Sequence, residues 1–379
     1  MRIAVITETY PPEVNGVALT VHDLVARMAA DGHELMLVRP RQPGVSALPL
    51  PQPIEELLVA GAALPKYPGL RFGFPAGGLL YRRFTARRPD AVYVATEGPL
   101  GWSAVRAARR LGIPVATGFH TRFDAYAGAY GLGLLESVVR HWLRRLHNAA
   151  GATCVPTAEL RDWLEQRGFR RVRVLARGVD TALFDPARRD AALRARWGLP
   201  ADGTAIIHVG RIAAEKNLEL AIEAFRHIEQ RSRGARFIWV GGGPQAERLR
   251  RAHPDFIYAG LRLGEDLAAH FASADLFLFP SLTETFGNVT LEAMASGVPT
   301  VAFSYGAARE HLRDGEHGRL ISFGDARAFI DASAALAADG PARLAMGDAA
   351  RRAALALRPE RVARDLVSLL AELPVGAAA

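Results

Sequence analysis

Short apolar runs alternate with amphipathic stretches from the first residues of the chain onward. RIAVIT (2–7) is a short apolar run that indicates a buried strand, and ALTVHDLVARMAADGH (18–33) repeats apolar residues at helical spacing. A second apolar run, ELMLVRP (34–40), follows at once. A strand, a helix and a strand in this order predict a βαβ unit, and therefore a parallel sheet with helices on both of its faces.

The same order of elements recurs in both halves of the chain. The further apolar runs are DAVYVAT (90–96), PVATGFH (114–120), GATCVPT (151–157), TAIIHVG (204–210), RFIWVGGG (236–243), FIYAG (256–260), DLFLFP (275–280) and PTVAF (299–303). Residues from about 40 to 78 are rich in proline and predict loops, whereas the Ala- and Arg-rich end (326–372) predicts helices. The pattern predicts an α/β protein of two doubly wound domains, joined by a turn-rich stretch at 176–190. Such domains bind ligands beyond the carboxyl ends of their strands.

Length and composition agree with this organisation and indicate in which compartment the protein is found. A chain of 379 residues suits about two domains. Hydrophobic residues make up 50% of it, so burial is ample and a folded protein is expected rather than a disordered one. No apolar run reaches the ~20 residues that span a bilayer. The opening apolar stretch is interrupted by Glu8, which is not typical of a signal peptide. The single cysteine fits a reducing compartment. We therefore expect a cytoplasmic protein. The net charge of +8 indicates an anionic partner, such as nucleic acid, acidic lipid or a phosphorylated ligand.

Lysine is rare in this chain, and its placement is informative. Of 47 basic side chains only Lys66 and Lys216 are lysines. Lys216 comes shortly after Arg211, which follows Gly210 at the end of a predicted strand, and a predicted helix comes next. Two cations beside the N-terminus of a helix favour the binding of a diphosphate. The alternative is a solvated loop whose charges have no ligand.

Glycines also follow the second predicted strand in the C-terminal half of the chain, RFIWV. Gly241, Gly243 and Ala246 match the spacing of a dinucleotide-binding fingerprint. That fingerprint belongs after the first strand of its domain, whereas this one follows the second. We interpret the glycines instead as positions where a phosphate or a neighbouring loop approaches the backbone closely.

Two glutamates bracket the stretch ETFGNVTLE (284–292), which follows the run DLFLFP. A helix is predicted to begin near Asn288 or Val289 and to end at Gly297, so Glu284 lies on a loop and Glu292 about two turns later. Carboxylates accept hydrogen bonds from sugar hydroxyls, and the backbone N–H groups between them suit an anion. The pair therefore suits an extended ligand such as a nucleotide sugar, whereas ordinary helix capping is the alternative.

These motifs together resemble a known family. SLTETFGNVTLEAMASGVPTVAF (281–303) is similar to the E-x7-E signature of the family 4 retaining glycosyltransferases, and HVGRIAAEKNL (208–218), VGGGP (240–244) and FHTRFDAYAGAYGLG (119–133) extend the resemblance. The resemblance implies the GT-B fold, with two Rossmann-like domains facing across a cleft. The acceptor-side domain would hold residues 1–186 and the donor-binding domain residues 187–357. A last helix (358–374) would cross back to the first domain.

The resemblance also implies roles for single residues. Arg211 and Lys216 would bind the donor diphosphate and stabilise the leaving group, Glu284 would hold hydroxyls of the transferred sugar, and His120 would lie beside the reacting sugar. The other residues expected to contact the donor are Gly16, Gly210, Gly243, Arg262 through its backbone at the base, Thr285, Phe286, Gly287, Asn288, Val289, and Glu292 at the ribose. The chain departs from the family at Arg177-Gly178, where Asn-Gly is frequent, and at Gly306-Ala307, where Gly-Gly is frequent.

The same resemblance points to a donor. ARGVD (176–180) and AYGLG (129–133) are similar to the bacterial branch that transfers mannose from GDP-mannose, or related sugars, to lipid-linked acceptors. No D-x-D sequence occurs, and we expect that no metal or other cofactor is required, because Arg211 and Lys216 would stabilise the departing diphosphate.

Two Arg-rich stretches bear on a membrane as a further partner. The amphipathic stretch LGLLESVVRHWLRRLHNAA (132–150), together with LLYRRFTARRP (79–89), suits either packing against the core or peripheral contact with the inner face of an anionic membrane. The sequence shows no nucleic-acid-binding module and no concentrated basic face, so nucleic acid is not an expected partner.

We therefore expect a metal-independent retaining glycosyltransferase that moves a hexose from a nucleotide-diphosphate sugar, with mannose from GDP-mannose as the first choice. The expected acceptor is a hydroxyl of a glycolipid, a lipid-linked molecule or a glycan. Retention of configuration is implied by the resemblance alone. The alternatives are a UDP-sugar donor, a GT-B sugar-nucleotide epimerase, an NAD-dependent oxidoreductase that uses the Gly241 motif, and a non-catalytic nucleotide-sugar binding module.

Overall fold

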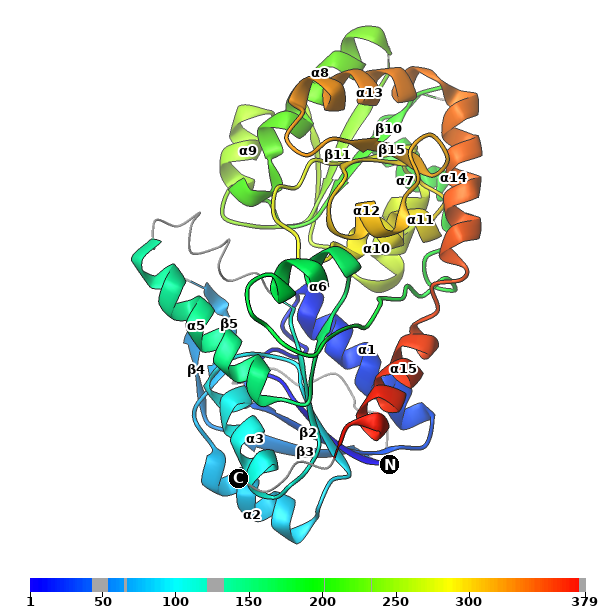
Figure 1. Cartoon of the computed structure of the whole chain (residues 1–379). Helices are drawn as coiled ribbons and strands as arrows, with labels where there is room; N and C mark the ends of the chain where they lie inside the picture. The colour runs from blue at the N-terminus through cyan, green and yellow to red at the C-terminus, as the bar shows by residue number, and fades with distance from the viewer. Residues whose placement is uncertain (43–53, 65–66, 121–132, 201, 233, 375–379) are drawn as a thin grey trace. The chain divides into compact units, whose positions relative to one another are not determined.

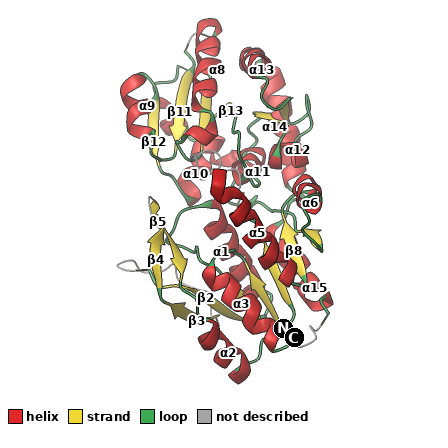
Figure 2. Cartoon of the chain, turned by 60° about the vertical axis from the view of Figure 1, so that its left-hand side comes forward, coloured by secondary structure: helices red, strands yellow, loops and turns green. Residues whose placement is uncertain are grey.

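The computed structural model divides the chain into two compact units (Figure 1). It describes residues 1–42, 54–64, 67–120, 133–200, 202–232 and 234–374. Unit 1 holds residues 1–177 and 359–379, and unit 2 holds residues 178–358. In each unit the helices cover both faces of a central sheet (Figure 2), which confirms the predicted α/β architecture.

The sheet of unit 1 has seven strands in the order β3-β2-β1-β6-β7-β8-β9, and all neighbours are parallel. The strands are β1 (Arg2–Ile6), β2 (Glu34–Pro40), β3 (Ile54–Val59), β6 (Ala91–Val94), β7 (Val115–Gly118), β8 (Ala152–Val155) and β9 (Val172–Val174). The chain winds in one direction from β1 to β3 and in the other from β6 to β9. The switch point therefore lies between β1 and β6.

Helices cover the two faces of this sheet in two separate groups. One face is covered by α1 (Gly16–Ala30) and α15 (Pro359–Glu372), which lie side by side in Figure 1. The other face is covered by α2 (Gly77–Ala86), α3 (Pro99–Arg110) and α5 (Gly133–Ala149), and α6 (Ala158–Glu165) packs against the end of α5. Helix α1 begins where the Asn15 side chain accepts the N–H of Ala18 (2.9 Å), and it ends before Gly32, whose φ is +82°.

The prediction of loops from about 40 to 78 was wrong over residues 54–59, 61–64 and 67–73. This region contains β3 and the antiparallel pair β4 (Gly61–Leu64) and β5 (Tyr67–Gly73). The proline-rich composition of the whole span led to the loop prediction, although only β5 among these strands contains a proline, Pro68. Proline is tolerated where few ladder hydrogen bonds are lost, and Pro68 lies in a sheet of only two strands.

The sheet of unit 2 has six parallel strands in the order β12-β11-β10-β13-β14-β15. They are β10 (Ala205–Val209), β11 (Arg236–Val240), β12 (Ile257–Gly260), β13 (Leu276–Phe279), β14 (Thr300–Phe303) and β15 (Gly318–Ile321). One face is covered by α8 (Leu218–Arg231), α9 (Ala246–Ala252) and α13 (Ala326–Ala338). The other is covered by α7 (Ala191–Arg196), α10 (Gly264–Ala272), α11 (Asn288–Ala295), α12 (Gly306–His311) and α14 (Gly340–Ala354). The switch point lies between β10 and β13.

The two units divide between Arg177 and Gly178, whereas the sequence analysis expected the division between residues 186 and 187. The turn-rich stretch after Gly178 packs on unit 2. Arg351 of α14 donates hydrogen bonds from Nη1 to the carbonyl oxygens of Thr181 (3.0 Å) and Phe184 (2.8 Å). The ring of Phe184 lies in the core of that unit. Burial and hydrogen bonding, rather than turn content, assign this stretch to unit 2.

Candidate active site

The loops that follow β10 and β13 meet at the switch point of unit 2. Lys216 lies in a short 3-10 turn, η2 (Ala214–Lys216), directly before α8, and Glu284 lies on the loop after β13. Their side chains form an ion pair and are only 13% and 14% exposed. The N–H of Leu282 also donates to the carbonyl oxygen of Glu215 (3.1 Å). The structure thus brings together a cation and an acid that the sequence analysis selected separately.

Arg211 lies on the same loop as Lys216. It follows Gly210, whose φ of +149° is accessible mainly to glycine. Its Nη1 atom lies 3.5 Å from Oε1 of Glu215, a side chain that is 7% exposed. Glu215 was not among the predicted site residues, although its position next to Lys216 was a signal. A buried carboxylate here orients the guanidinium group and offsets part of the positive charge.

The glycines after β11 admit a neighbouring loop. The N–H of Ile212 donates to the carbonyl oxygen of Gly242 (2.9 Å). A Cβ atom on Gly241 would lie 1.9 Å from the oxygen of Gly210, and one on Gly243 would lie 2.4 Å from the oxygen of Ile212. Side chains at these two positions would therefore separate the glycine loop from the loop that carries Arg211.

The segment from Thr285 to Val289 runs from this loop into the first turn of α11. The helix begins at Asn288 after its N-cap residue Gly287, which has a φ of +95° and no side chain that could cap the helix. The carbonyl oxygen of Phe286 accepts the N–H of Ala307 (2.7 Å). The Phe286 ring belongs to the core, so this residue offers a ligand its backbone only. A helix N-terminus beside two cations favours the binding of an anion.

Tyr305 holds the same loop from the other side. Its hydroxyl donates to the carbonyl oxygen of Glu284 (2.6 Å). The sequence analysis did not select this residue, since nothing in a local pattern relates it to a loop twenty-one positions earlier.

Glu292 lies on α11 in a partly buried position. Its Oε2 atom is inaccessible to solvent and has no hydrogen-bond partner among the described residues. Burial raises the pKa of the carboxyl group from 4.5 to about 7. An acceptor that is buried without a donor suits the hydroxyl groups of a bound ligand.

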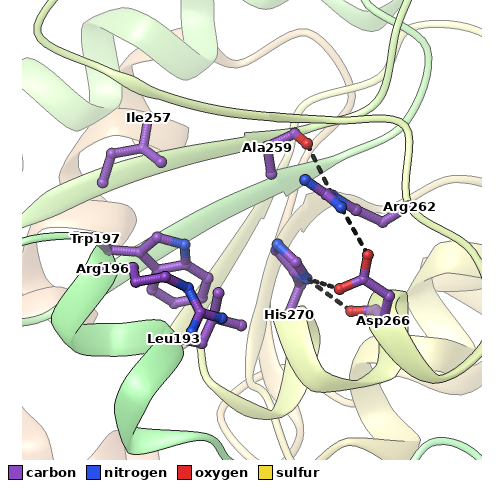
Figure 3. A pocket seen from close by; sticks show the side chains of 8 residues that line it. All are labelled: Leu193, Arg196, Trp197, Ile257, Ala259, Arg262, Asp266 and His270. Atoms are coloured by element: carbon purple, nitrogen blue, oxygen red, sulfur yellow. Dashed lines mark hydrogen bonds and ion pairs between the residues drawn. The ribbon is translucent and has the colours of Figure 1, made fainter.

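Arg262 lies after β12 and lines a pocket of about 350 Å³ (Figure 3). Its Nε atom donates to the carbonyl oxygen of Ala259 (2.8 Å), and its Nη1 atom donates to Oδ2 of Asp266 (2.8 Å). Nδ1 of His270 lies 2.7 Å from the carbonyl oxygen of Asp266. The remaining lining residues are Leu193, Arg196, Trp197 and Ile257. The Arg262 side chain is thus engaged within this pocket, and its expected backbone contact with a base stays a prediction.

Gly16 and His120 belong to unit 1, whereas the other predicted site residues belong to unit 2. Gly16 is the exposed first residue of α1, and His120 follows β7 and is 7% exposed. Both lie beyond the carboxyl ends of strands. The rest of the motif that begins at residue 119, residues 121–132, lies outside the described part of the chain.

Comparison with known proteins identifies the family. The profile described as Glycosyltransferase Family 4 matches residues 14–183, and the one described as Glycosyl transferases group 1 matches residues 203–339. The chain is 33% identical to a GDP-mannose-dependent alpha-mannosyltransferase from Mycobacterium tuberculosis, over 86% of this chain and 85% of that protein. The chain belongs to the family 4 glycosyltransferases.

This family 4 glycosyltransferase is also similar to a second enzyme in sequence and to a solved structure in fold. It is 27% identical to the alpha-monoglucosyldiacylglycerol synthase of Streptococcus pneumoniae, over 80% of this chain and 71% of that protein. The crystal structure of sucrose-phosphate synthase from Thermosynechococcus elongatus superposes with a TM-score of 0.78 at 21% identity, over 97% of this chain and 98% of that one. The predicted GT-B fold is confirmed.

Within the described ranges, no three His, Cys, Asp or Glu side chains are grouped in a way that could hold a metal ion. No helix in the same ranges combines the length and the apolarity that crossing a bilayer requires.

Proposed function

We propose that this glycosyltransferase transfers mannose from GDP-mannose to a hydroxyl group of a glycolipid, lipid-linked or glycan acceptor. The observation that carries the proposal is the meeting of Lys216, Arg211 and Glu284 beside the N-terminus of α11. Cations and helix N–H groups suit a diphosphate, and a carboxylate suits sugar hydroxyls. The name of the Mycobacterium tuberculosis relative supports GDP-mannose as the donor, and that of the Streptococcus pneumoniae relative supports a lipid acceptor.

The ion pair between Lys216 and Glu284 gives the proposal its order of events. The two side chains neutralise each other before a donor binds. A diphosphate would compete for Lys216 and release the carboxylate of Glu284 toward the hydroxyl groups of the sugar. Glu292, with its buried oxygen, would then accept hydrogen bonds from the ribose.

In the proposed reaction the bond between the anomeric carbon and the diphosphate oxygen breaks, and a bond from the acceptor oxygen forms on the same face. The acceptor proton leaves with the diphosphate. Arg211 and Lys216 stabilise the charge that develops on the leaving group, a role that a divalent metal has in other transferases. Stabilisation of this kind is typically a large part of transition-state binding.

Helix α5 supports the peripheral membrane contact that the sequence analysis considered. Leu143 and Leu146 are buried against the core of unit 1, whereas Val138 is 61% exposed and Trp142 38% exposed. Exposed arginines lie on the same helix; they are Arg140, Arg144 and Arg145. We propose that this outer surface contacts anionic lipid. Sedimentation with anionic vesicles, but not with zwitterionic ones, should carry the protein down, and Val138→Ser should weaken this binding.

The donor is tested by calorimetry with GDP-mannose, UDP-glucose, UDP-GlcNAc, UDP-galactose and NAD, on the wild type and on Glu292→Ala. We expect GDP-mannose to bind selectively and the variant to lose most of this affinity. Selective binding of a UDP-sugar would replace the donor and keep the chemistry. Binding of NAD alone would favour an oxidoreductase and overturn the proposal.

Product analysis separates the remaining alternatives. Incubation of the bound donor with lipid extracts should give a glycosylated lipid together with GDP. Conversion of the donor to an isomer without any acceptor would indicate an epimerase, and binding without turnover of any kind would indicate a binding module.

A further inference from the structure

The side chain of Arg177 is buried in unit 1 next to His120. Its Nη2 atom lies 2.5 Å from Nδ1 of His120. Its Nε and Nη1 atoms are inaccessible to solvent and have no hydrogen-bond partner among the described residues. Burying a guanidinium group with unsatisfied donors is unfavourable for folding. The placement of Arg177 therefore suggests a role other than stability.

The contact with Arg177 determines where His120 carries its proton. A guanidinium group has donors only, so Nδ1 of His120 must accept. The ring proton then lies on Nε2, which is 3.1 Å from the hydroxyl oxygen of Tyr93 and donates to it. Both ring nitrogens are thus engaged inside unit 1, and the ring is a neutral imidazole in one tautomer.

We propose that Arg177 is a positioning residue, which fixes the tautomer and the orientation of the His120 ring. The proposal rests on the proposed function and on the role that the family resemblance implies for His120, beside the transferred sugar. It also deepens that function, because a ring with both nitrogens engaged does not exchange a proton with the sugar or the acceptor. His120 then serves as a rigid, neutral surface of the site. Arg177 is also the residue that replaces the asparagine frequent in the family.

The charges around His120 give a measurable consequence. Burial, the cation of Arg177 and the neighbouring His147 all hold the pKa of His120 well below its usual 6.5. The other titratable groups facing this cluster are Tyr93 on β6 and Cys154 on β8, and Glu97 lies 3.7 Å from His147. The folded-state pKa is lowered, so His120 stays neutral into acid. Removal of the cation of Arg177 should raise this pKa.

The direct test is nitrogen NMR of the full-length protein with ¹⁵N-labelled histidine, between pH 5 and pH 8. His120 is identified by the signal that disappears in His120→Asn. In the wild type we expect Nε2 to carry the proton and Nδ1 to carry none over the whole range. In Arg177→Met we expect a mixture of tautomers and a higher pKa. Arg173→Met, a change of an exposed arginine on β9, is the matched control and should leave the His120 signals unchanged.

The second test measures kcat and KM with the sugar nucleotide that binds the wild type. Arg177→Met should lower kcat about tenfold or more with little change in KM, with a steeper loss below pH 6, and Arg177→Lys should restore part of the rate. A protonated Nδ1 in the wild type would overturn the proposal even if no variant folds. An unchanged kcat in a folded Arg177→Met with an altered tautomer would also overturn it. If no sugar nucleotide binds to a wild type that shows the expected tautomer, the proposed function fails and the hydrogen-bond assignment stands.

Discussion

At the switch point of unit 1, between β1 and β6, the N-terminus of α3 is occupied by a carboxylate of the chain itself. Oε1 of Glu8 accepts the N–H of Leu100 (2.8 Å). At the switch point of unit 2, between β10 and β13, the N-terminus of α11 follows Gly287 and has no side-chain cap. Both sheets wind in the same way, so the same helix position receives a carboxylate of the chain in one unit and follows a glycine without a side chain in the other.

Glycines permit both arrangements, but for different reasons. A Cβ atom on Gly98 would lie 1.9 Å from Oε2 of Glu8, so glycine here admits the internal carboxylate. Gly287, with its φ of +95°, turns the chain into α11 without a capping side chain. A helix N-terminus attracts anions in either case. The comparison teaches that the winding of a sheet creates a place for an anion, and that the loop residues decide whether a ligand can use it.

Removal of the cation at the switch point of unit 2 should have the largest effect. Lys216→Ala is expected to lower kcat about 10²- to 10³-fold, the usual loss when one group that stabilises a transition state is removed. The melting temperature should change little. Steady-state kinetics with the bound donor measure this, and Arg327→Ala, on the exposed surface of α13, is the control. A rate near that of the wild type would remove Lys216 from the proposed mechanism.

Alanine in the glycine loop should affect both stability and the site. Gly243→Ala places a Cβ atom 2.4 Å from the oxygen of Ile212 in a backbone of positive φ, and is expected to destabilise the protein by about 1–3 kcal/mol. It should also weaken donor binding. Gly242→Ala meets no atom within 4 Å and should do neither. Urea unfolding and calorimetry on the two variants give the comparison, and equal behaviour would contradict it.

Glu292→Gln should separate stability from binding. The folded-state pKa of about 7 lies above the unfolded value, so the native state loses stability as the pH rises from 4.5 through 7. Glutamine avoids this loss, and the variant should be more stable by about 1–3 kcal/mol at pH 8 and equal to the wild type near pH 4. Donor affinity should fall at least tenfold. Unfolding curves at both pH values test the sign, and a destabilised variant at pH 8 would contradict the assignment.

Glu8→Gln is the corresponding change in unit 1 and should have the smallest effect. Burial raises the pKa of Glu8 to about 7, while the N–H of Leu100 lowers it. An amide oxygen can still accept this N–H, so we expect a gain of about 1 kcal/mol at pH 8 that vanishes near pH 4. Donor affinity should not change. A loss of donor affinity equal to that of Glu292→Gln would show that the two switch points are not used differently.

The sequence by itself determined most elements and one binding segment. The spacing of apolar residues located β1, β2 and, from residue 90 onward, every strand of the two sheets except β9 and β15, which it missed. The E-x7-E segment and the glycine that follows it predicted a helix start near Asn288 or Val289, and α11 begins at Asn288. These features are local, because helix and strand periods and the φ of a glycine depend on residues close in sequence. The same reasoning failed at β3 to β5, because the prolines around these short strands indicated loops although only β5 contains one, and pairing with partner strands decided the structure.

Only the tertiary structure decided which side chains meet. Arg177 reaches His120 across fifty-seven positions, and Tyr305 holds the loop of Glu284. Each pair depends on the order of strands in the sheet, which brings the loops at the carboxyl ends together. The raised pKa of Glu292 and the internal use of Glu8 likewise follow from burial, which exists only after the helices pack on the sheets. The local spacing of apolar residues determines the helices and strands. The order of the strands in each sheet, together with burial, determines which side chains meet at the carboxyl ends of the strands and how they titrate.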